Sequence, residues 1–115
     1  MRKYYAHIFL LLLIVFGFCV EASAAKVLQV SSSSTLLIGD HNRTYKVKLN
    51  CLDISPDKEE RAFNWLKSEL PRYTRVNIRP NGSEDGILLA RVIPLGDNID
   101  IEKKLEANGL ASNSC

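Results

Sequence analysis

The chain has 115 residues, of which 46% are hydrophobic and 24% are charged, and its formal net charge is +2 at neutral pH. This composition is typical of a globular protein and excludes a disordered, collagen-like or highly charged chain. The length suits one domain. The near balance of acidic and basic residues argues against bulk electrostatic binding of nucleic acid, because such binding grows with the number of phosphates neutralised.

The first 24 residues have the pattern of a secretory signal peptide. Arg2 and Lys3 precede an apolar run from Ile8 to Val20, and a small-residue cleavage sequence ends at Ala24. The run of 13 residues is shorter than the ~20 that a membrane-spanning helix needs, so an uncleaved N-terminal anchor is the alternative. We therefore expect export, and a mature chain of residues 25–115 without a stable membrane span.

Two cysteines remain in that mature chain, and an even pair in an exported protein suggests a disulfide. A bond between Cys51 and Cys115 would stabilise the fold by about 4 kcal/mol on the chain-entropy model. Two alternatives stay open. Cys51 could be a small buried thiol at the end of a strand, and Cys115, at a mobile chain end, could join two copies in a disulfide-linked dimer. A zinc site is excluded because the mature chain has no CxxC motif, no cluster of Cys and His, and one histidine, His41.

Three strands are predicted at the start of the mature chain. The runs Lys26–Val30, Thr35–Ile38 and Thr44–Leu49 show strand-like alternation. Four serines separate the first two, and a turn over Gly39–Arg43 separates the second from the third. Tight turns between consecutive strands favour an antiparallel meander.

A helix is predicted next. Ser55 is suited to the N-cap and Pro56 to the first helical position. Apolar residues at helical spacing from Ala62 to Leu70 form one stripe, and Pro71 ends the helix.

The second half of the chain predicts two more strands and a short helix. Arg75–Arg79 is strand-like, Pro80–Gly86 is rich in turn residues and predicts a loop, and Ile87–Pro94 is a long apolar strand. Ile101 and Leu105 mark a short helix that ends at Gly109. The order β-β-β-α-β-β-α, mainly β with one longer and one short helix, fits a closed five-stranded barrel of the OB-fold type.

The order and spacing of particular residues point to a family. Val30 and Thr35 flank the serines, and Val47-Lys48-Leu49 lies shortly before Asp53. Later segments continue the match with Gly86, Leu89 and Ala90, and with Leu105, Gly109, Leu110 and Ala111. Together, from about Val27 to Ala111, they resemble the staphylococcal-nuclease (thermonuclease-like) domain family. The resemblance implies an OB-fold barrel and Ca²⁺-dependent hydrolysis of DNA and RNA phosphodiesters.

The residues at the family's catalytic positions are largely replaced. The family uses two carboxylates to hold the metal, a further carboxylate near the attacking water, and two arginines on the phosphate. Losing one charge-stabilising donor typically costs about 10²–10³ in rate, and a site with a single carboxylate holds calcium weakly. The resemblance therefore implies a degenerate site without competent catalysis. In family order, the matching positions are Ser34 and Asp53 for the metal carboxylates, Lys48 and Ile87 for the arginines, and Pro56 or Asp57 for the catalytic glutamate.

These observations predict an exported, non-catalytic OB-fold protein that acts as a binding or structural module and needs no cofactor. The alternative is a weak Ca²⁺-dependent nuclease that would use Asp53, Asp57 and Lys48. A protein partner is favoured over nucleic acid, because a small barrel places solvated charges on alternate strand positions whatever its partner. The candidate nucleic-acid face consists of Lys46, Lys48, Arg75, Arg79 and Arg91.

Overall fold

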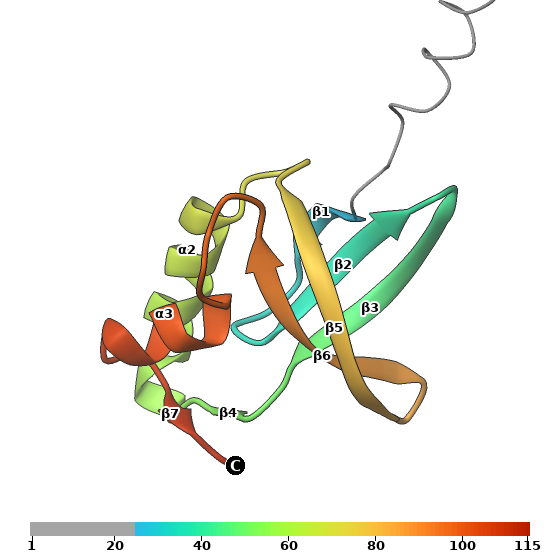
Figure 1. Ribbon diagram of the computed structural model, residues 1–115. Helices are drawn as coiled ribbons and strands as arrows, with labels where there is room; N and C mark the ends of the chain where they lie inside the picture. Colours follow the sequence, from blue (N-terminus) through green and yellow to red (C-terminus); the bar gives the residue numbers. More distant parts are fainter. Residues whose placement is uncertain (1–24) are drawn as a thin grey trace, which may run out of the picture.

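The computed structural model describes residues 25–115, so the leader predicted for residues 1–24 lies outside the described part. Five strands form a closed barrel in the order β1-β2-β3-β6-β5, and two helices lie together on one side of it (Figure 1). The predicted fold class is confirmed: the chain is an OB-fold-like barrel, mainly β, with one longer and one shorter helix.

The first three strands form the predicted antiparallel meander. They are β1 (Ala25–Val30), β2 (Thr35–Asp40) and β3 (Arg43–Leu49). The turn between β2 and β3 is shorter than expected and contains two residues, His41 and Asn42, with φ of 50° and 67°. Two successive left-handed residues are the geometry of a type I′ hairpin turn, which matches the twist of the flanking strands.

The predicted central helix begins with a tighter turn. Pro56–Lys58 form a 3₁₀ turn, η1, and the α-helix α2 follows over Glu59–Glu69. Ser55 occupies the N-cap position of η1, but its side chain makes no capping hydrogen bond there. The apolar stripe points inward as predicted, because Ala62, Leu66 and Leu70 are fully or almost fully buried.

The predicted loop over Pro80–Gly86 is wrong. Strand β5 runs from Arg75 to Glu84 and pairs with β6 (Ile87–Pro94) through a turn made of Asp85 and Gly86 alone. A register shift between Pro80 and Gly82 accommodates the proline, which a regular ladder position would not tolerate. The two turn residues have φ of 53° and 78°, which again is the geometry of a type I′ turn.

Two further pairings close the barrel. β6 runs parallel to β3, with Val47 opposite Leu88, and β5 pairs with the start of β1, with Ala25 opposite Val76. Alternation along the strands turns one side chain in two toward the interior. The helix α3 (Ile101–Ala107) adds its apolar face to the same core. Fully buried core side chains are Val27, Leu36, Ile38, Val47, Ala62, Leu66, Ala90, Val92, Ile101 and Leu105.

A covalent link joins the end of the barrel's third strand to the end of the chain. Cys51 and Cys115 form an intramolecular disulfide with a Cα–Cα distance of 5.0 Å. Beside it, β4 (Leu52–Asp53) pairs with β7 (Ser112–Asn113), two strands that the sequence did not predict because each has only two residues. The half-buried Cys51 is therefore not a free thiol, and Cys115 is held within its own chain.

Among residues 25–115 there is no helix of the length and apolarity that crossing a membrane requires.

Candidate functional site

The positions that the sequence resemblance predicted as catalytic divide into two groups in the structure. The first lies on neighbouring strands or directly beside them. The Leu49 N–H donates to the carbonyl of Ser34, the residue before β2, at 2.8 Å. Lys48 pairs with Thr35 on β2, and Ile87 begins β6 beside β3. This group offers a hydroxyl, an ammonium and an alkyl side chain, in place of a carboxylate and two arginines.

The second group contains the two aspartates, which are both exposed. Asp53 lies in β4, and Asp57 lies in η1, where a hydrogen bond with the Ser55 side chain is the main cause that lowers the pKa of its carboxyl. Within the described residues, no three His, Cys, Asp or Glu side chains are grouped as metal ligands would be. The calcium site suggested by Asp53 and Ser34 stays a prediction.

The five predicted basic residues are all exposed and lie on three adjacent strands, β3, β6 and β5. Arg79 and Arg91 are directly opposite each other across the β5–β6 pair. Like charges at such positions destabilise a sheet unless something neutralises them. We call these residues the basic strip: Lys46, Lys48, Arg75, Arg79 and Arg91.

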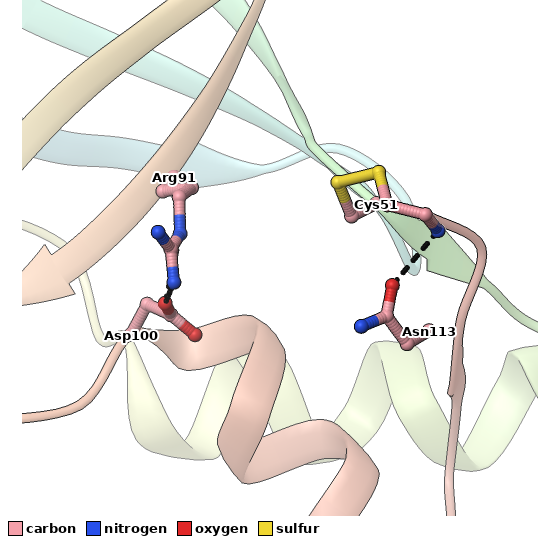
Figure 2. The surroundings of a disulfide bond; sticks show 5 residues. Cys51, Arg91, Asp100 and Asn113 are labelled. Atoms are coloured by element: carbon pink, nitrogen blue, oxygen red, sulfur yellow. Dashed lines mark hydrogen bonds and ion pairs between the residues drawn. A yellow bond between two sulfur atoms is a disulfide. The ribbon is translucent and has the colours of Figure 1, made fainter.

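A cleft of about 410 Å³ lies between helix α3, the β5–β6 pair and the disulfide. We call it the α3 cleft. Figure 2 shows the Arg91–Asp100 pair and the disulfide on opposite sides of this region, with α3 passing below. Most of its lining residues are polar or charged, and they carry charges of both signs. The residues are Asn50, Cys51, Arg79, Pro80, Asn81, Arg91, Asp100, Glu102, Lys103, Glu106 and Asn113.

Asp100 is the most heavily bonded side chain of the cleft. Its Oδ2 accepts hydrogen bonds from Arg91 Nε at 3.0 Å and Nη2 at 2.7 Å, and its Oδ1 accepts from the Lys103 N–H at 2.9 Å as the N-cap of α3. Burial favours the neutral acid, but the Lys103 N–H and the Arg91 guanidinium outweigh it and lower the pKa of Asp100. Asp100 is therefore ionised and ties α3 to β6.

Glu102 is a buried acid beside this pair and is only 4% exposed. Its Oε1 accepts a hydrogen bond from the Val92 N–H at 3.2 Å, and its buried Oε2 has no donor within reach among the described residues. Burial, with the nearby Asp100 charge adding to it, raises the pKa of Glu102 to about 8. Glu102 is thus protonated at neutral pH, and its O–H can donate to the Asp100 carboxylate, which explains the unpaired oxygen.

Sequence reasoning identified Arg79 and Arg91 but missed Asp100 and Glu102. Asp100 could have been found, because an aspartate directly before a helical apolar pattern is an N-cap signal. Glu102 carries no such signal, since a glutamate in the first turn of a helix is usually exposed.

No protein-family model matches the chain, and no curated protein is significantly similar to it.

Proposed function

We propose that the protein is an exported, non-catalytic OB-fold module of the staphylococcal-nuclease-like type, which binds an acidic surface of a partner protein through the basic strip. The observation that carries the proposal is the placement of five exposed basic side chains on three adjacent strands, with Arg79 directly opposite Arg91. Asp100 already pairs with Arg91, so a partner carboxylate would pair with Arg79, which no ion pair among the described residues includes.

The replaced family positions support a non-catalytic role. Lys48 keeps a positive charge but lacks the planar fork that binds two phosphate oxygens at once, and Ile87 has no donor at all. Ser34 cannot supply the charge that a calcium ligand of the family supplies. Calcium would enter only under the nuclease alternative.

The disulfide supports the proposed export. Disulfides persist in oxidising compartments and are rare where thioredoxin and glutathione keep thiols reduced. The Cys51–Cys115 bond therefore agrees with the secretory signal pattern of residues 1–24.

A titration of the purified protein with a fluorescent oligo-glutamate peptide tests the proposal. We expect binding that weakens as salt is added, because exposed charges are screened over about 10 Å at 0.1 M salt. A combined Lys48→Gln and Arg75→Gln variant should bind several-fold more weakly. Matched controls are Arg61→Gln and Lys67→Gln combined, which remove the same charge from exposed positions on α2. Equal effects of both pairs, or no binding, would contradict the proposal.

Two further measurements separate the other candidate functions. If a single-stranded oligonucleotide binds more tightly than oligo-glutamate at the same salt, the partner is nucleic acid and not protein.

Incubation with single-stranded DNA and Ca²⁺ should leave the DNA intact. Cleavage that stops with a chelator and in Asp53→Ala would establish the nuclease alternative instead.

A further inference from the structure

The α3 cleft contains two arginines from adjacent strands, but only one of them has a carboxylate partner. Arg91 is paired with Asp100, whereas none of the ion pairs among the described residues includes Arg79. We propose that the α3 cleft is a binding site for a carboxylate group of a peptide, which Arg79 and Lys103 hold from opposite walls of the cleft. This inference rests on the proposed function, because Arg79 belongs to the basic strip.

Arg79 reaches the cleft from a regular ladder position of β5, and the strand becomes irregular just after it. Its neighbour Pro80 also lines the cleft, and the register shift of β5 lies between Pro80 and Gly82. Such a bulge bends the strand at Asn81, which also lines the cleft. Arg91 lies directly opposite Arg79 on the neighbouring strand. Arg79 therefore lies next to a like charge, and none of the ion pairs among the described residues gives Arg79 a carboxylate partner.

The charges of the cleft fit one carboxylate better than a phosphate. Three basic and three acidic side chains line it, but Glu102 is protonated at neutral pH because burial raises its pKa to about 8. The surplus is one positive charge. A doubly charged phosphate carries more negative charge than this surplus can neutralise, and it would be repelled by the two carboxylates. A single carboxylate would pair with Arg79 in the way that Asp100 pairs with Arg91.

Three amide side chains of the cleft suit a peptide backbone next to that carboxylate. Asn50, Asn81 and Asn113 all line it. The Asn113 Oδ1 accepts from the Cys115 N–H at 2.8 Å, and in Figure 2 the Asn113 amide nitrogen points toward the side where Arg91 and Asp100 lie. This nitrogen can donate to a peptide carbonyl. A cleft of about 410 Å³ takes a small ligand or a short segment and not a folded domain.

Three acetylated alanine-based tripeptides test the site by NMR titration of the ¹⁵N-labelled protein, followed at the arginine Nε–H signals. One has a free C-terminal carboxylate, one has a C-terminal amide, and one has the amide and a central glutamate. We expect the two carboxylate peptides to shift the Arg79 signal with millimolar affinity and the uncharged peptide to leave it unchanged. Whichever of the two carboxylate peptides binds more tightly shows whether the site prefers the carboxylate of a chain end or that of an acidic side chain.

Two substitutions of the same chemistry on the same strand separate the cleft from the strip. Arg79→Gln should weaken carboxylate binding at least tenfold, whereas Arg75→Gln, exposed on β5 but outside the cleft lining, should change it less than twofold. Equal losses in both variants would overturn the inference, since binding would then depend on overall charge. Inorganic phosphate that binds at the cleft more tightly than the carboxylate peptides would overturn it as well.

The outcomes distinguish this inference from the function on which it rests. If oligo-glutamate binds to the basic strip but none of the tripeptides shifts the Arg79 signal, the cleft is not a carboxylate site and the proposed function stands. If neither oligo-glutamate nor the tripeptides bind, both fail.

Discussion

Asp100 and Glu102, at the start of α3, hold this helix against β6 by hydrogen bonds. A buried carboxylate without partners would be costly, but a protonated carboxyl beside an ionised one satisfies both groups. The Val92 N–H and the Arg91 guanidinium complete the arrangement from β6. The proton on Glu102 is therefore part of the packing of α3 against the sheet, and removing it has a structural consequence.

The stability of the fold should consequently fall as the pH rises from the ordinary glutamate range toward 8. The folded state holds the Glu102 proton up to about pH 8, and the unfolded state releases it near 4.5. Because the folded state binds the extra proton in this interval, the free energy of unfolding decreases with rising pH, by about 1.4 kcal/mol per pH unit at most. Urea denaturation at pH 5, 7 and 9 measures the loss, which we expect to be several kcal/mol.

The variant Glu102→Gln tests the origin of this pH dependence. Glutamine can accept from the Val92 N–H and donate its amide to Asp100 at any pH, so its stability should lack the fall. Glu106→Gln, at a half-buried position of α3, is the matched control and should retain it. If the free energy of unfolding falls with pH equally in the wild type and in Glu102→Gln, Glu102 is not the group that causes the pH dependence.

At the scale of single residues, the sequence revealed side chains but not their partners. Arg79 and Arg91 could be recognised as exposed because they alternate with apolar neighbours. The protonation of Glu102 depends on α3 packing against β6, which is a tertiary contact between segments ten residues apart and has no local pattern.

The β5–β6 hairpin shows how turn chemistry can mislead at the scale of elements. Every residue from Pro80 to Gly86 is favoured in turns or disfavoured in strands, yet only Asp85 and Gly86 make the turn. Asn81 and Gly82 fall at the register shift, where a strand absorbs an extra residue. Asp-Gly is among the strongest type I′ signals, and counting back from it would have extended both strands.

Substitutions at Gly86 and Ser83 distinguish this hairpin from a loop. Gly86→Val forces a β-branched residue into a left-handed conformation with φ of 78° and should lower the free energy of unfolding by about 1–2 kcal/mol. Ser83→Val, at an exposed strand position opposite Leu88, should be neutral or slightly stabilising. Thermal denaturation of both variants provides the comparison. A destabilising Ser83→Val would indicate that this segment is not a strand.

At the scale of the whole molecule, the barrel was predictable and the cleft was not. Strand periodicity and the order of elements follow from local sequence, and together they leave few topologies besides the OB-fold barrel. The α3 cleft combines side chains from β5, β6, α3 and the segments on both sides of the disulfide. Such convergence depends on how distant segments pack, which no local pattern contains.

The disulfide should contribute substantially to global stability. Cys51 and Cys115 are 64 positions apart, and closing a loop of that length stabilises by about 4 kcal/mol on the chain-entropy model. We expect Cys51→Ser, Cys115→Ser and the double variant to lose a similar amount in urea denaturation, and reduction of the wild type to reproduce it. Non-reducing electrophoresis should show a monomer. A band at twice the monomer mass would indicate pairing between chains instead.

The same bond also divides the chain mechanically. It ties α2, β5, β6 and α3 into one covalent ring, whereas the β1–β3 meander is outside the ring and is held by strand pairing and core contacts alone. A force applied between Ala25 and Cys115 could therefore extend only the residues before the ring, to roughly 90 Å at the span of an extended chain. After reduction the whole described chain would lengthen to roughly 300 Å. The bond thus acts as a limit on how far a partner that pulls on this domain can stretch it.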